Sequence, residues 1–193
     1  MYFSQESYGK AEPKLTRRNF LKLGVLTAVA SISPLPSFAA PSNPFTSEKN
    51  LSFYNIHNDE RLSTVYWRNG QYLPDVLRAI NYIMRDHRTN EIKVIQVQLL
   101  DLLYDIHRNL NTKQFFHIVS GYRSPATNNY LYKHSTGVNK NSLHVNGMAV
   151  DIRIPLCDLA FLGNTAKSLK RGGVGLYPES NFVHVDVGAV RYW

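Results

Sequence analysis

Two stretches of the chain repeat apolar residues at the spacing of an α-helix. One opens at Pro74, and the other extends from about Val94 to Leu110. Apolar residues three and four positions apart share one face of a helix, so both stretches are expected to pack on a sheet as scaffold. Ahead of them Leu62–Arg68 is β-prone, and Asn69-Gly70 suits the tight turn of a hairpin. The pattern therefore predicts a hairpin followed by two helices.

Two later segments alternate apolar and polar residues with the period of two that a β-strand produces. In Met148–Ile154, Asp151 falls on the face opposite the branched apolar residues. In Phe182–Val187, His184 and Asp186 share the face opposite three valines. If these strands are neighbours, the three polar side chains converge on one cleft.

Residues 134–147 have neither period and are rich in Asn, Ser, Gly and His, which predicts a long loop of the kind that is often functional. The loop carries His144, and Gly147 lets the chain turn sharply into the next strand. A short helix is expected around residues 126–133. Pro155–Leu169 is expected to be helical in part, with an interruption at Gly163-Asn164.

His144, Asp151 and His184 have the nitrogen and oxygen donors that bind zinc. Three such ligands with an open fourth position are typical of a catalytic zinc site. The chain has seven histidines, however, and a histidine is often a hydrogen-bonded structural residue. From the residues alone, a metal site and a structural cluster both stay open.

Residues 1–39 have the pattern of an export signal. Arg17-Arg18 precedes Phe-Leu-Lys, as in twin-arginine signals. The apolar stretch Leu23–Ile32 is too short for a membrane span, and Ser37-Phe38-Ala39 supplies the small residues of a cleavage site. We therefore expect cleavage after Ala39 and a periplasmic protein without a stable membrane span. An uncleaved anchor or a basic amphipathic helix is the alternative.

Composition and charge narrow the class of partner. Residues 40–60 are interpreted as a linker, ahead of a domain over residues 61–193. The net charge is +8, of which removal of the leader would leave +5, and this favours an anionic polymer such as a cell wall. The basic residues are scattered and form no nucleic-acid motif, so nucleic acid is not expected as a partner.

The single cysteine, Cys157, excludes an intramolecular disulfide and is expected to be a small buried residue.

Several strings of residues carry a family resemblance. Ser142-x-His144-x-x-Gly147-x-Ala149-x-Asp151 and Val183-His184-Val185-Asp186 resemble the hedgehog/D-Ala-D-Ala metallopeptidase superfamily. The strings Ser120–Ser124, Gly172–Pro178 and Arg191–Trp193 are similar to one bacterial branch, once called domain of unknown function 882. The likeness covers about residues 70–193. It implies an α+β fold with a small antiparallel sheet flanked by helices, and zinc held by His144, Asp151 and His184.

The resemblance also implies an activity. Members of that branch include zinc peptidases that hydrolyse peptide cross-links of bacterial peptidoglycan, so the expected substrate is a cross-linked murein peptide and the expected enzyme is a monomer. A D-Ala-D-Ala carboxypeptidase would use the same chemistry on a narrower substrate. A zinc-containing module that binds the cell wall without catalysis is the alternative from another class.

The resemblance assigns the remaining roles less completely. Arg123 matches the cleft arginine of the family, which implies binding of a substrate carboxylate or stabilisation of the developing oxyanion, although it could instead cap carbonyls at a turn. Many relatives have Glu or Asp three residues before the last ligand, where this chain has Asn181. Asp186 is therefore favoured as the general base, unless it only orients a ligand histidine. Glu179 and His134 are the other candidate bases.

Overall fold

The structure of the protein, a computed structural model, describes residues 47–135 and 137–193. The expected export signal and the first residues of the expected linker lie outside this part of the chain. Within it, no helix is both long enough and apolar enough to cross a membrane.

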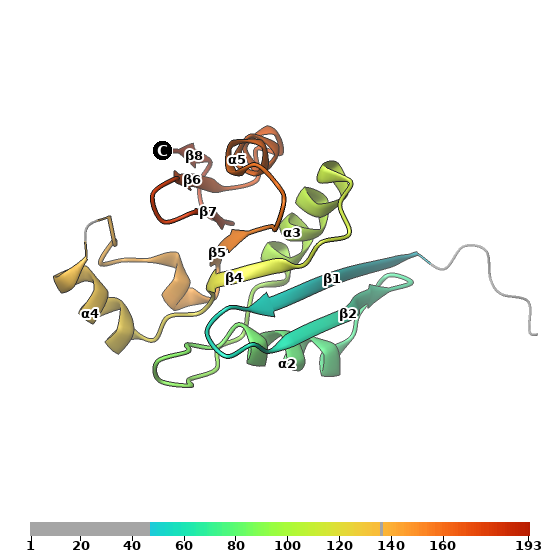
Figure 1. Ribbon diagram of the computed structural model, residues 1–193. Helices are drawn as coiled ribbons and strands as arrows, with labels where there is room; N and C mark the ends of the chain where they lie inside the picture. The colour runs from blue at the N-terminus through green and yellow to red at the C-terminus, as the bar shows by residue number, and fades with distance from the viewer. Residues whose placement is uncertain (1–46, 136) are drawn as a thin grey trace, which may run out of the picture. The chain divides into compact units, whose positions relative to one another are not determined.

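One mixed sheet forms the framework of the described domain (Figure 1). Its eight strands lie in the order β3-β2-β1-β4-β5-β7-β6-β8, and the pairs β1/β4 and β6/β8 are parallel. The α+β class is confirmed, but the expected sheet, small and antiparallel, is wrong in size and in pairing. The strands are β1 (Glu48–Asn55), β2 (Arg61–Arg68), β3 (Gln71–Tyr72), β4 (Phe116–Ser120), β5 (Ala149–Arg153), β6 (Gly173–Tyr177), β7 (Phe182–Asp186) and β8 (Arg191–Tyr192).

Strand β1 lies inside the segment interpreted as a linker, and that interpretation is wrong for its residues. Leu51, Phe53 and Asn55 alternate with more exposed residues and are buried. The strand pairs antiparallel with β2 and parallel with β4, which places it in the interior of the sheet. Its intervening Asn, Ser and Tyr residues face outward, which gives the segment the composition of a linker.

The predicted hairpin and the first helices are confirmed. Asn69 and Gly70, between β2 and β3, both have positive φ angles, as a tight hairpin turn requires. The helices are α2 (Pro74–Ile83), α3 (Val97–Leu110), α4 (Pro125–His134) and α5 (Leu159–Ser168), with a short 3₁₀ helix, η1 (Leu143–Asn146). The expected interruption at Gly163 is wrong, since α5 continues through it. A side chain there would press on Leu176 of β6, so this glycine lets the helix approach the sheet closely.

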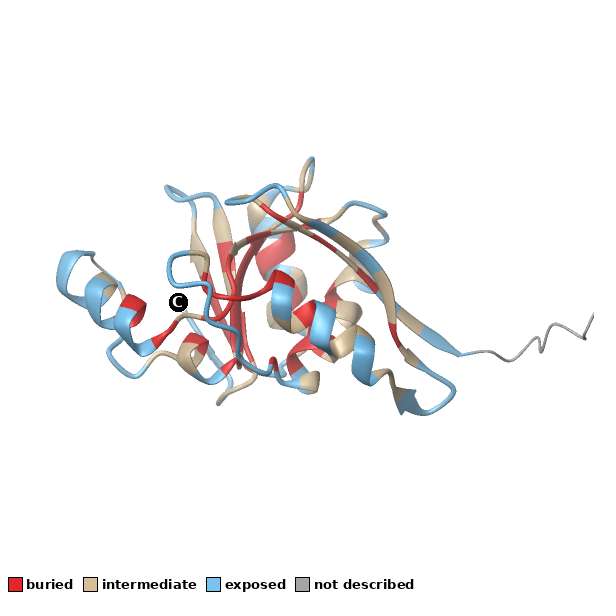
Figure 2. Cartoon of the chain, turned by 90° about the horizontal axis from the view of Figure 1, so that it is seen from below, coloured by how far each residue is buried: buried red, intermediate tan, exposed pale blue. Residues whose placement is uncertain are grey.

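Alternation along the strands separates the core from the polar face. Val150 and Ile152 of β5, with Val183 and Val185 of β7, join the core that includes buried residues of α2, α3 and α5. Figure 2 shows buried positions along the middle of the sheet and on the inner sides of the helices. The residues between these strand positions point to the opposite face, where α4, η1 and the loop between them lie near the strand ends (Figure 1).

Candidate metal centre

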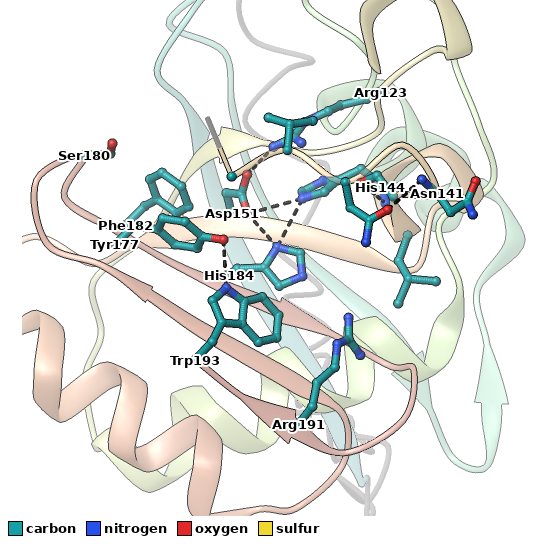
Figure 3. Close-up of a pocket in the computed structure, with 15 residues that line it drawn as sticks. Arg123, Asn141, His144, Asp151, Tyr177, Ser180, Phe182, His184, Arg191 and Trp193 are labelled. Atoms are coloured by element: carbon teal, nitrogen blue, oxygen red, sulfur yellow. Dashed lines mark hydrogen bonds and ion pairs between the residues drawn. The ribbon is translucent and has the colours of Figure 1, made fainter. Parts of the chain in front are cut away.

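A cavity of about 480 Å³ opens on that opposite face (Figure 3). Residues of β5 and β7 form its floor, and the loop between α4 and η1 forms one side, as expected for a functional loop. Its lining residues are Arg123, Gly137, Val138, Asn139, Asn141, Ser142, Leu143, His144, Asp151, Tyr177, Ser180, Phe182, His184, Arg191 and Trp193.

His144, Asp151 and His184 meet at the floor of this cavity. Asp151 and His184 lie directly opposite each other in the antiparallel pair β5/β7. Three atoms, His144 Nε2, His184 Nδ1 and Asp151 Oδ1, form a triangle with sides of 3.2, 3.2 and 2.8 Å. The convergence predicted from strand alternation is therefore present for Asp151 and His184, whereas the third predicted residue, Asp186, contacts the far nitrogen of His184 and does not line the cavity.

The backbone around His144 fixes which of its nitrogens faces the cluster. Its Nδ1–H donates to the carbonyl of Gly121 at 2.7 Å, so the lone pair of Nε2 points to the other two side chains. The turn that carries it ends at Gly147, whose φ of +66° and whose contact with the Val94 carbonyl leave no room for a Cβ atom. Burial lowers the pKa of His144 despite the nearby carboxylate, which favours the neutral, ligating form.

Asp186 performs the corresponding task for His184. The Nε2–H of His184 donates to Asp186 Oδ2 at 3.0 Å, which leaves Nδ1 directed toward the cluster. Burial alone would lower the pKa of His184, but its hydrogen bonds to Asp151 and Asp186 raise it. A carboxylate behind a histidine is the usual support of a metal-binding imidazole, because it fixes the tautomer and the ring orientation.

The Asp186 carboxylate is saturated with donors and buried. Besides His184, the backbone N–H groups of Gly173 and Gly188 donate to Oδ1, at 3.0 and 2.8 Å, and the guanidinium of Arg191 contacts both oxygens. Burial would raise the pKa of Asp186, but these donors hold it at about 2. A carboxylate so engaged is poorly suited to accept a proton, so the geometry favours orientation of His184 over the role of general base.

The other two candidate bases lie outside the cavity lining. Glu179 is exposed on the turn between β6 and β7, next to Ser180, which does line the cavity. His134 is exposed at the end of α4, where its Nδ1 is hydrogen-bonded to the carbonyl of Tyr130. Among the described residues, Asp151 is the only acidic group in the cavity lining.

Arg123 lines the cavity, as the resemblance implies for a cleft arginine, and it lies beside Asp151. Its Nη2 donates to Asp151 Oδ2 at 2.5 Å and its Nε donates to Ser120 Oγ at 2.8 Å. Burial raises the pKa of Asp151, but the two histidines and Arg123 outweigh that effect and lower it well below the usual range. The carboxylate is thus ionised, with Oδ1 facing the histidines and Oδ2 facing the arginine.

The donor triangle fits a zinc ion. For tetrahedral zinc with bonds of about 2.0–2.1 Å, ligand atoms are separated by roughly 3.3–3.4 Å. The three sides of the triangle, 2.8 to 3.2 Å, lie slightly below that value. Two histidine nitrogens and one ionised carboxylate form a donor set that zinc binds in proteins once both imidazoles are neutral, and the cavity leaves the fourth side open.

Sequence reasoning missed an aromatic wall beside this cluster. Trp193 lies next to His184, with ring centroids 5.4 Å apart, and its indole N–H donates to the Tyr177 hydroxyl at 2.8 Å. Tyr177 in turn stacks on Phe182. Strand alternation could have identified Phe182, which shares a face with His184, but Trp193 arrives through the distant pairing of β8 with β6.

Comparison with known proteins gives a consistent family match. A family model described as peptidoglycan L,D-endopeptidase MepK matches residues 44–193. Peptidoglycan L,D-endopeptidase MepK of Escherichia coli (strain K12) is 40% identical over 177 residues, which cover 92% of this chain and 96% of the relative. The probable peptidoglycan L,D-endopeptidase MepK of Haemophilus influenzae (strain Rd) is 39% identical over 178 residues, with 92% and 95% covered. No solved structure matches the chain.

Proposed function

The chain belongs to the peptidoglycan L,D-endopeptidase MepK family, and we propose that it is a zinc-dependent endopeptidase that hydrolyses peptide cross-links of bacterial murein. The observation that carries the proposal is the triangle of His144 Nε2, Asp151 Oδ1 and His184 Nδ1 at the floor of an open cavity. The names of the relatives favour an endopeptidase over a D-Ala-D-Ala carboxypeptidase.

The same three residues are the proposed zinc ligands. When bound there, zinc supplies Lewis acidity, which polarises a peptide carbonyl and makes water a better nucleophile near neutral pH. The chain fixes the tautomer and the ring orientation of the two histidine ligands through the Gly121 carbonyl behind His144 and the Asp186 carboxylate behind His184. In this proposal Asp186 is a positioning residue.

Arg123 is proposed to stabilise negative charge that develops on the substrate carbonyl. Ser120 accepts from its Nε and Asp151 accepts from its Nη2, so the side chain is fixed in the cavity, where it is 13% exposed. Within the described part of the chain, its Nη1 has no protein acceptor and offers its N–H groups to the substrate. Donors that are already in place cost no reorganisation when charge develops.

Export is proposed to precede this activity. The twin arginine at residues 17–18 and the small residues before Ala40 support a periplasmic location, where murein is accessible.

Purified cross-linked muropeptides provide the test of function. The zinc-loaded protein should convert the dimers to monomers, with the broken bond identified by mass spectrometry, and a chelator should stop the reaction. Intact dimers after prolonged incubation with folded, zinc-loaded protein would instead support a cell-wall-binding module without catalysis.

A further inference from the structure

Arg191 is a second arginine of the cavity, and it lies across the metal-ligand cluster from Arg123 (Figure 3). Its Nη1 donates to Asp186 Oδ1 and to the Ala189 carbonyl, at 3.3 and 3.0 Å. Its Nη2 donates to Asp186 Oδ2 at 2.7 Å. Asp186 thus occupies the outer edge of the guanidinium, which both Nη atoms form.

The other edge of this guanidinium is available. An arginine has five N–H groups, and Nε–H points in the same direction as the second N–H of Nη2. Within residues 47–135 and 137–193, Nε of Arg191 has no hydrogen-bond acceptor, and the side chain is 44% exposed. Two parallel N–H groups are the arrangement that binds a carboxylate in bidentate fashion.

Arg123 has the opposite arrangement. Ser120 and Asp151 occupy its Nε–Nη2 edge, which is the edge that Arg191 leaves open. The side chain of Arg123 is also much less exposed than that of Arg191, at 13% against 44%. Of the two cavity arginines, Arg191 therefore has the geometry for a carboxylate that arrives from solution.

Trp193 and Asp186 hold the Arg191 guanidinium in place before any ligand binds. Its Cζ lies 5.1 Å from the centre of a Trp193 ring, within the range of a cation–π interaction. Trp193 is fixed by its hydrogen bond to Tyr177 and by contact with Gly175, where any Cβ atom would meet the indole at 2.4 Å. A guanidinium held from two sides loses little conformational entropy when a ligand binds.

We infer that the Nε–Nη2 edge of Arg191 binds a free carboxylate on the substrate residue next to the scissile bond. The inference rests on the proposed function, since it places that carboxylate beside the metal ligand His184. Besides Arg191 and Arg123, the described cavity lining contains no lysine or other arginine, and Asp151 is its only carboxylate. The expected ligand is therefore an anionic peptide whose carboxylate lies on the Arg191 side of the metal-ligand cluster.

The experiment compares two uncleavable ligands on the zinc-loaded protein. Both are short cross-link peptides in which a ketomethylene group replaces the scissile amide, and they differ only in a free carboxylate or a carboxamide on the adjacent residue. Calorimetry gives the dissociation constant of each. The wild-type protein should prefer the carboxylate about 10- to 100-fold, the value of a charge-assisted hydrogen-bond pair.

Three variants locate the source of that preference. Arg191→Gln should bring the ratio of the two dissociation constants close to one, mainly through weaker binding of the carboxylate ligand. Arg191→Lys, which keeps a cation near Asp186 but lacks the planar fork, should retain part of the preference. Arg171→Gln removes the same charge from an exposed pair with Asp105 outside the cavity lining, and should leave the ratio unchanged.

Several results would overturn the inference. They are a wild-type ratio near one, no binding of either ligand, or an undiminished carboxylate preference in the folded, zinc-loaded Arg191→Gln protein. If Arg191→Gln weakens both ligands equally, Arg191 only supports Asp186 and the inference is also wrong. Turnover of the matching cleavable peptides is measured separately, so absence of hydrolysis alongside a clear carboxylate preference would reject the proposed function and keep the carboxylate site.

Discussion

Replacement of Asp186 by Asn separates an orienting carboxylate from a general base. The substitution keeps the size of the side chain but turns one of its two oxygens into a donor. The backbone N–H groups of Gly173 and Gly188 both point at Oδ1, so the amide oxygen is expected to remain there and the amide nitrogen to face His184. The amide nitrogen is a donor, so Nε2 of a neutral His184 must accept from it. The proton of the imidazole then has to be on Nδ1, the atom that faces the other metal ligands.

The expected effect is therefore on zinc affinity. Loss of a carboxylate that supports a metal-binding histidine costs about 10- to 100-fold in metal affinity, or roughly 1.4–2.7 kcal/mol. Competition with a chromophoric zinc chelator measures the dissociation constant of zinc. Turnover of a muropeptide dimer, measured with zinc well above that constant, should return to within a few-fold of wild type.

A general base predicts the reverse pattern. Removal of a base lowers turnover about 100- to 10,000-fold, and added zinc does not restore it. Unchanged zinc affinity together with such a loss at saturating zinc would refute the orienting role. Asp105→Asn, in the exposed pair with Arg171, is the matched control and should change neither quantity.

Three further predictions test the fold and the route to the periplasm. Asp86 is buried, and although burial raises its pKa, hydrogen bonds from Thr127, Ser124 and Arg88 lower it from 3.8 to about 2. The ionised carboxylate therefore stabilises the folded state by about 2 kcal/mol above pH 4, and this contribution is lost as the pH falls through 2. Urea unfolding should show that Asp86→Asn is less stable than wild type at pH 7 and that the difference in unfolding free energy shrinks in acid. A difference that stays constant with pH would contradict this prediction. Gly147→Ala should destabilise the protein and weaken zinc binding more than Gly70→Ala. Both glycines have a positive φ angle, but only at Gly147 would a Cβ atom meet backbone, at 2.2 Å from the Val94 carbonyl oxygen. The free energy of unfolding and the zinc affinity are measured for both variants, and equal effects of the two substitutions would refute the prediction. Lysines in place of Arg17 and Arg18 keep the charge but should stop export, and normal periplasmic accumulation in cell fractions would count against a twin-arginine signal.

Local periodicity predicted the parts of the site that depend on strand geometry. Alternation in β5 and β7 placed Asp151 and His184 on one face, and antiparallel pairing sets them directly opposite each other. The same alternation put Asp186 on the face of His184. It could not distinguish a carboxylate in the cavity from one behind the histidine, because that depends on donors from Gly173, Gly188 and Arg191.

Features created by distant pairing were not predictable from local pattern. Strand β1 has polar residues between its buried ones, and its place in the sheet depends on contacts with β2 and β4. Arg191 and Trp193 reach the cavity because the two-residue strand β8 pairs with β6, and no local periodicity marks so short a strand. Gly163 has a low helix propensity, but its contact with Leu176 of β6 favours a glycine in α5.

Zinc titration of the metal-free protein tests the central claim most directly. Muropeptide turnover should be absent without metal, rise in proportion to added zinc, and level off at one zinc per chain. Asp151→Asn, which removes the charge of the ligand but keeps the size of the side chain, should need far more zinc to reach any turnover. Full turnover in the metal-free protein, or a titration of Asp151→Asn that coincides with that of wild type, would contradict a zinc site formed by His144, Asp151 and His184.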